Sequence, residues 1–157
     1  MIADTGIRLG ESAELLKSDF VEPDCILCVN IRPHPWRSLK TLSHKRLVPL
    51  VGSSKWATEQ ILAHSTDSRF AFPNYNDGQR TNANSASAAL NKWLKSKIGR
   101  GYTIHSFRPS MRDRLRAVEY PSEIIDQIDG WLAHGVRNSY GNGYPERTLL
   151  QWLRKLC

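Results

Sequence analysis

Apolar residues recur at helical spacing along most of the chain. The first stripe predicts an amphipathic helix near the amino end, formed by Leu9, Ala13, Leu16 and Phe20. Residues 58–64 are also predicted to be helical, and residues 86–97 should form a helix with one apolar side made of Leu90, Trp93, Leu94 and Ile98. Three later stripes predict further helices, at Phe107, Met111, Leu115 and Val118, at Ile124, Ile125, Ile128 and Leu132, and at Leu149, Leu150, Leu153 and Leu156.

Two short segments rich in β-branched and apolar residues, 25–31 and 45–51, predict strands. Residues 32–44 between them are rich in proline and polar residues and suit an exposed hairpin connection, and residues 65–82 have the composition of a loop. The pattern therefore predicts an α+β fold, mainly α-helical with one small antiparallel β-sheet. A chain of 157 residues fits one domain with a real hydrophobic core.

The distribution of charge points to a polyanionic partner. The formal net charge is +7, and no acidic residue occurs between Asp24 and Glu59 or between Asp77 and Asp113. Such acid-free windows favour phosphate binding, because a nucleic acid releases condensed counterions when basic side chains neutralise it. The candidate DNA-contacting residues in these windows are Arg37, Lys45, Arg80 and Arg112. The alternative is solvated basic loops that bind nothing.

The three cysteines suit a reducing compartment. An odd count without an apolar leader favours the cytoplasm over secretion. Cys25 and Cys28 have no second cysteine pair or nearby histidine pair to complete a zinc site, so we expect both thiols to pack in a strand. No apolar run approaches the ~18 residues that a membrane span requires.

Five short motifs follow one another in a recognisable order. Thr5-Gly-Ile-Arg8 is followed by Glu11, and Lys40 stands six residues before Arg46 in "RLVPL". His105 and Arg108 form an H-x-x-R motif, Trp131 follows Arg108 by 23 residues, and Tyr140 follows Trp131 by nine. This order resembles the catalytic domain of tyrosine recombinases, the phage integrase family. The resemblance extends from Thr5 to Tyr144.

The resemblance implies a fold, a domain organisation and a reaction. Residues 1–157 are expected to form a single catalytic domain that lacks the amino-terminal DNA-clamping domain and the first catalytic-domain helix of the family. The expected activity is site-specific cleavage and rejoining of double-stranded DNA through a 3′-phosphotyrosyl intermediate, without cofactor or metal. A homo-tetramer on synapsed DNA is implied, with the isolated domain a monomer or dimer. A bacterial or phage-encoded, nucleoid-associated cytoplasmic protein without a membrane partner would fit.

The family pattern also assigns roles to residues. Arg8 and Arg108 would bind the non-bridging phosphate oxygens, since guanidinium groups are planar and permanently charged. His105 would contact the phosphate or the tyrosine hydroxyl, Lys40 would protonate the leaving 5′ oxygen, and Tyr140 would be the nucleophile. Trp131 takes the place where most members have histidine, and its indole N–H can only donate. Glu11 is expected to orient a basic group of the site.

Several alternatives stay open. Lys45 competes with Lys40 as general acid, and Tyr144 competes with Tyr140 as nucleophile. His105 could instead be a helix-start histidine bonded to backbone, and Trp131 a core residue. Pro109 stands where the family usually has histidine and is tolerable only in the first turn of a helix. At the level of function, the chain could be a DNA-binding remnant of a prophage integrase that does not cleave, or a type IB topoisomerase.

Overall fold

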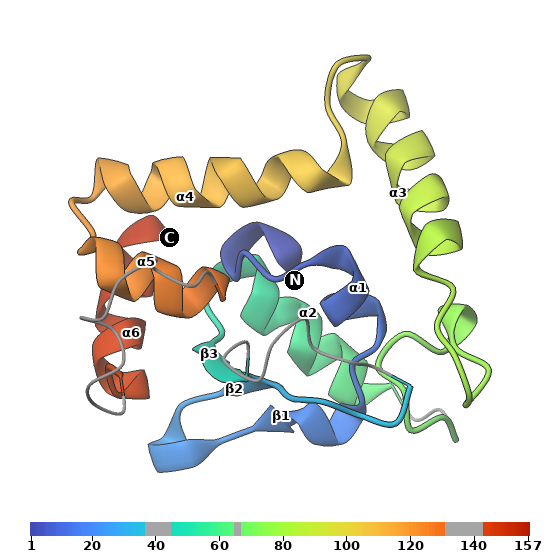
Figure 1. The fold of residues 1–157 in the computed structure, drawn as a ribbon, viewed down its shortest axis with the longest axis horizontal. Coiled ribbons are helices and arrows are strands. Elements are labelled where there is room, and N and C mark those ends of the chain that lie inside the picture. Colours follow the sequence, from blue (N-terminus) through green and yellow to red (C-terminus); the bar gives the residue numbers. More distant parts are fainter. Residues whose placement is uncertain (37–44, 65–66, 131–142) are drawn as a thin grey trace.

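The structure, a computed structural model, describes residues 1–36, 45–64, 67–130 and 143–157 (Figure 1). Its helices are α1 (Leu9–Ala13), α2 (Gly52–Ala63), α3 (Ala83–Ile98), α4 (Phe107–Ala117), α5 (Ser122–Asp129) and α6 (Glu146–Leu153). Its strands are β1 (Phe20–Val21), β2 (Cys28–Ile31) and β3 (Arg46–Pro49). Short 3₁₀ turns lie at Ile2–Asp4, Lys17–Asp19, Pro23–Cys25, Pro73–Tyr75, Ile104–Ser106 and Arg154–Leu156. The predicted mainly helical α+β fold is confirmed.

The strands form an antiparallel sheet in the order β1-β2-β3. Val29 of β2 pairs with Val48 of β3, and both side chains are fully buried. In Figure 1 the sheet lies at one side of the molecule, α4 runs along the opposite side, and α1 and α2 lie between them. The antiparallel register of β2 and β3 agrees with the predicted hairpin connection, of which residues 37–44 lie outside the described part of the chain.

The core is built by the apolar stripes of the later helices. Met111 and Leu115 of α4, Ile124, Ile125 and Ile128 of α5, and Leu149 and Leu153 of α6 are all buried. The buried residues of each of these three stripes lie in a helix, as the sequence predicts, and Pro109 is the third residue of α4, within its first turn. Leu132, the last residue of the α5 stripe, lies outside the described residues.

The first predicted helix is shorter than its apolar spacing indicates. α1 ends at Ala13, Phe20 lies in β1, and Leu15 rather than Leu16 is fully buried. Tertiary hydrogen bonds replace helical ones after Ala13: the Ala71 N–H donates to the Leu15 carbonyl at 2.8 Å. The backbone of this segment therefore pairs with residues 69–71 instead of continuing the helix.

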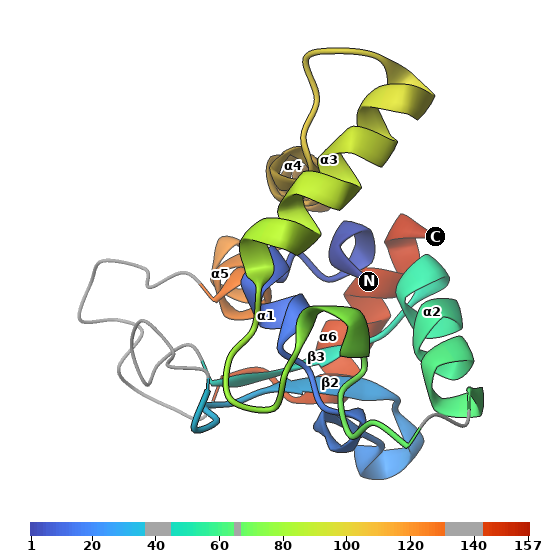
Figure 2. The same ribbon diagram turned by 90° about the vertical axis from the view of Figure 1, so that its right-hand side faces the viewer.

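Two other expectations need correction. Trp93 and Ile98 are each 55% exposed, although the sequence placed them on the apolar side of α3. Figure 2 shows the carboxyl half of α3 standing away from the rest of the molecule, and of the described residues on this side only Leu94 is buried there. Cys28 is buried in β2 as expected, but Cys25 is exposed in a 3₁₀ turn and not in a strand.

The remaining elements differ from prediction mainly in length. α2 begins at Gly52, six residues before the predicted start, because Asp4 accepts a hydrogen bond from the Ser53 N–H at 3.0 Å and caps the helix. Residues 67–82 are loop apart from one 3₁₀ turn, as expected. No helix in the described ranges is long and apolar enough to cross a membrane.

Candidate active site

The turn before α1 presents Arg8. Thr5 is fully buried, and its hydroxyl donates to the Met1 carbonyl at 2.9 Å. Gly6 adopts a left-handed φ of 64°, which a residue with a side chain rarely tolerates. Arg8 then becomes the N-cap of α1, with its side chain 39% exposed. The Thr-Gly pair thus turns the chain so that Arg8 stands at the start of a helix.

Glu11 holds this arginine in place. One carboxylate oxygen of Glu11 accepts from the Arg8 backbone N–H at 2.8 Å, and the other accepts from Arg8 Nη1 at 2.8 Å. The same carboxylate pairs with Arg46 of β3, with 3.0 Å between Nη2 and Oε2. Burial opposes ionisation of Glu11, but the charges and hydrogen bonds of Arg46 and Arg8 outweigh it and hold the pKa of Glu11 below its ordinary value.

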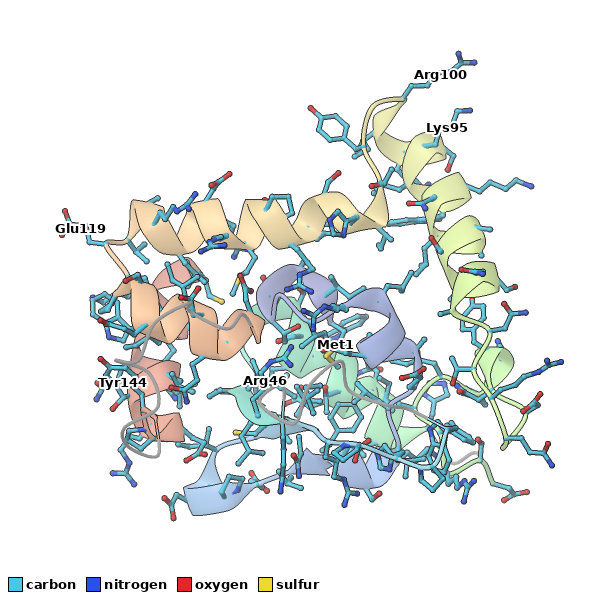
Figure 3. All side chains as sticks on the ribbon, viewed as in Figure 1. Met1, Arg46, Lys95, Arg100, Glu119 and Tyr144 are labelled. Atoms are coloured by element: carbon cyan, nitrogen blue, oxygen red, sulfur yellow. The ribbon has the colours of Figure 1, made fainter. Side chains whose placement is uncertain are left out.

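Arg46 connects the sheet with two helices. Its Nε donates to the Ile128 carbonyl at the end of α5 at 2.8 Å, while its guanidinium pairs with Glu11 on α1. Figure 3 shows Arg46 near the middle of the molecule. Its side chain is 4% exposed, so this is a buried ion pair whose breakage leaves an uncompensated charge.

The second predicted arginine enters from α4. His105 lies in the 3₁₀ turn Ile104–Ser106 that leads into α4, and Arg108 follows in the first turn of α4. Arg108 is 8% exposed, and its Nη2 donates to the backbone carbonyl of Asp129 at 3.0 Å. Burial and then the charge of Arg8 lower the pKa of Arg108. Two guanidinium groups therefore repel each other at this place, which favours an anion between them.

Arg8, His105 and Arg108 line one cavity of about 280 Å³. Its other lining residues are Ile2, Ile7, Leu9, Ser87 and Ile104. One water molecule occupies ~30 Å³ in the liquid, so a phosphate group fits. An anion bound here would have two arginines and an imidazole on a largely apolar wall, where charge–charge interactions are less screened than in water.

Other predicted site residues do not reach this cavity or cannot be placed. Arg37, Lys40, Trp131 and Tyr140 lie outside the described residues. Lys45 is exposed just before β3. Arg80 is 89% exposed beside Asp77, and Arg112 pairs with Asp126 at 3.4 Å. Neither Arg80 nor Arg112 lines the cavity with Arg8, so their assignment to DNA contact stays a prediction.

Two residues beside the site were not predicted from the sequence. Arg46 entered the motif only through its distance from Lys40, and Asp129 belongs to no motif. Arg46 shares the buried face of β3 with Val48, two residues on, and an arginine on a buried face signals a buried partner. Asp129 ends α5, where the helix dipole disfavours a carboxylate. Both signals are visible in the sequence once the elements are known.

A mainly helical fold with a small antiparallel sheet of this kind is also found in a solved structure of a recombinase. The chain is similar to XerA recombinase, with a TM-score of 0.58 and 17% sequence identity over 98% of this chain and 54% of that one. It thus spans about half the length of the XerA recombinase chain. At this identity the likeness shows the fold alone. No family model and no curated protein sequence matches the chain.

Proposed function

We propose that this chain is the catalytic domain of a site-specific tyrosine recombinase, which cleaves and rejoins double-stranded DNA. The observation that carries the proposal is the convergence of Arg8, His105 and Arg108 on one cavity that a phosphate group fits. Arg8 stands at the start of α1, whereas His105 in a 3₁₀ turn and Arg108 in α4 follow about 100 positions later in the sequence. The likeness to XerA recombinase supports the same assignment.

The arginines would stabilise the transition state. Attack on a phosphodiester places extra negative charge on the non-bridging oxygens, and the guanidinium groups of Arg8 and Arg108 would neutralise it. His105 would donate to the phosphate or assist the nucleophile. Glu11 would not touch the phosphate, because its carboxylate is already bonded to Arg8 and Arg46 and would repel an anion. Its part is to position Arg8.

The covalent step uses residues outside the described ranges, so their roles rest on the sequence motifs. The Tyr140 hydroxyl gives its proton to His105 or to water and its oxygen forms a bond to phosphorus, while the bond from phosphorus to the 5′ oxygen breaks. Lys40 gives a proton to that leaving oxygen, and Trp131 donates to a phosphate oxygen. The 3′-phosphotyrosyl bond retains the energy for rejoining, when a 5′ hydroxyl attacks and releases the tyrosine.

Charge on the surface supports DNA as the partner. The last turns of α3 and the loop after it carry Lys92, Lys95, Lys97 and Arg100 without an acidic neighbour in sequence. Figure 3 shows Lys95 and Arg100 at the end of α3 that projects from the molecule. A basic projection of this kind would contact the DNA backbone next to the cleaved phosphate. The homo-tetramer on synapsed DNA belongs to the same proposal.

A pool of nicked DNA duplexes with randomised sequence tests the proposal. The nick lets the cleaved fragment diffuse away, so that a covalent protein–DNA adduct accumulates and survives denaturation. We expect adducts with the unaltered chain, none with Tyr140→Phe, and undiminished adducts with the matched control Tyr144→Phe. DNA binding without any adduct would contradict strand transfer. Relaxation of supercoiled plasmid without sequence preference would indicate a topoisomerase instead.

A further inference from the structure

Asp129 is a buried carboxyl group in an unfavourable place. It is the last residue of α5 and is 2% exposed, and its Oδ1 has no hydrogen-bond partner in the described part of the chain. This oxygen lies against Gly6, where a Cβ atom would overlap it. Burial of an oxygen that has no partner among the described residues, and the negative end of the helix dipole, both disfavour a charged carboxylate here.

Arginines surround this carboxyl group. Arg108 donates to the backbone carbonyl of Asp129, and the charges of Arg108, Arg112 and Arg46 all favour its ionised form. Asp126, on the same helix, opposes ionisation. The charge of Arg108 acts on the carboxyl group, and the same guanidinium lines the cavity, so Arg108 couples the two electrostatically.

The charges of this cluster nearly balance before any ligand binds. Arg8, Arg46 and Arg108 face two carboxylates, those of Glu11 and Asp129, which leaves one net positive charge. Glu11 accepts hydrogen bonds from two of the arginines, whereas Oδ1 of Asp129 accepts none from a described residue. An incoming anion therefore competes more directly with Asp129 for the positive charge of Arg108.

We propose that Asp129 is the counter-ion of this arginine cluster and that it takes up a proton when a phosphate group enters the cavity. The added negative charge makes a second carboxylate on the same arginines less favourable. Because the two equilibria are linked, the bound anion raises the proton affinity of Asp129 by the same factor by which protonation of Asp129 raises the affinity for the anion. This inference rests on the proposed function only for the assignment of the cavity as a phosphate site.

The protonation behaviour of Asp129 fits this role. Burial raises its pKa to about 6, although Arg108, Arg112 and Arg46 work in the other direction. The group is then mostly ionised at neutral pH when the cavity is empty and lies close enough to its pKa for an anion to change its state. A carboxylate with an ordinary pKa near ~3.9 would remain ionised throughout.

Sulfate binding tests the inference without DNA. Sulfate keeps the same charge across the range used, so any pH dependence belongs to the protein. Histidine also titrates in this range, and His105 lines the cavity, so the full chain is studied with His105→Gln as background. The arginine Nε–Hε signals in NMR spectra report binding. We expect sulfate to bind ~5-fold or more tightly at about pH 5.5 than at about pH 8.

Asp129→Asn in the same background should abolish this difference and give the tighter affinity at both pH values. Asp113→Asn is the matched control, because it removes the same charge from a side chain that is 72% exposed, and it should leave the pH dependence unchanged. Calorimetry in two buffers of different ionisation enthalpy gives a second measurement, since proton uptake on sulfate binding should appear in the background chain and disappear in the Asp129→Asn variant.

A pH dependence that survives Asp129→Asn would overturn the inference, and so would sulfate that leaves the Arg108 signal unchanged at both pH values. These outcomes are independent of the adduct assay. Linked sulfate binding without any DNA adduct would reject strand transfer and leave the role of Asp129 intact. Adducts together with pH-independent sulfate binding would do the reverse.

Discussion

Arg46 on β3 and Glu11 on α1 form a buried ion pair, with 3.0 Å between Nη2 and Oε2 and side chains only 4% and 8% exposed. The pair fixes α1, whose N-cap is Arg8, against the edge strand β3. A chain that loses one partner must keep the other charge buried without compensation, and this is costly.

We therefore expect Glu11→Ala to lower the free energy of unfolding by ~3–5 kcal/mol, the usual cost of breaking a buried pair. Urea denaturation at neutral pH measures the change. Glu59→Ala is the matched control, because Glu59 forms an ion pair with Lys55 at 3.9 Å with both side chains more than half exposed. That variant should change stability by less than ~1 kcal/mol. Equal losses in the two variants would contradict the importance of the buried pair.

Gly6 gives the second prediction. Gly6→Ala introduces a Cβ atom that overlaps Asp129 Oδ1 at a residue with φ of 64°, so it should destabilise the chain by ~1–3 kcal/mol. Thermal unfolding would detect this loss. Gly10→Ala is the control, since its Cβ would meet nothing within 4 Å and alanine favours the helix α1. Gly10→Ala should be neutral or stabilising.

The overlap also predicts non-additivity. Asp129→Gly removes the carboxyl group that the new methyl group would meet, so Gly6→Ala should cost less in that background than in the unaltered chain. The unfavourable φ remains in both backgrounds, and part of the cost therefore persists. If Gly6→Ala costs the same in both, the backbone conformation alone explains it.

The sequence predicted the elements that bury an apolar stripe against the core. Met111, Ile128 and Leu149 lie on such stripes, and all three are buried. Periodicity cannot reveal whether another element covers a given stripe, which is why Trp93 was assigned to a packed side and is exposed. The same limit applies to Phe20, which lies in β1 after Leu15 and Lys17 form backbone hydrogen bonds with a distant segment.

The site was only partly predictable from motifs. Arg8, His105 and Arg108 were assigned from the motifs of the family that the sequence resembles, and the fold brings them to one cavity. Arg46 and Asp129 act through neighbours that are distant in sequence, and Arg46 reaches Ile128 across 82 positions. A partner of this kind becomes visible only when the sheet and α5 are placed beside each other.

The pH dependence of stability should contain two opposite contributions. Asp129 has a raised pKa of about 6, so the folded chain binds its proton more tightly than the unfolded chain. Its ionisation therefore costs stability as the pH rises from about 4 to about 6. Glu11 has a lowered pKa, so its ionised carboxylate stabilises the fold at pH values above the ordinary pKa of a glutamate, near ~4.3. This stabilisation is lost as the pH falls below that value.

Asp129→Asn should remove the first contribution. At pH 7 this variant should be more stable than the unaltered chain by up to ~3 kcal/mol. That free energy corresponds to the difference between the pKa of Asp129 in the folded chain, about 6, and the ordinary pKa of an aspartate, near ~3.9. Near pH 4 the two chains should have similar stability. Urea denaturation across this range measures both. A variant that is less stable at pH 7 would show that the Asp129 charge stabilises the fold.

Arginine geometry can be separated from charge by Arg8→Lys and Arg108→Lys. Both keep the positive charge and lose the planar fork that binds two phosphate oxygens. Each should reduce formation of the covalent DNA adduct by ~100-fold or more, as expected when one donor to a transition-state oxyanion is lost.

Arg8→Lys should leave thermal stability nearly unchanged, because its side chain is 39% exposed, whereas Arg108→Lys should also lower stability because Arg108 is buried. Arg116→Lys, at a side chain 62% exposed, is the control and should form the adduct at the normal rate. Full adduct formation by Arg8→Lys would mean that a point charge suffices at this position and that the cavity does not grip the phosphate through paired hydrogen bonds.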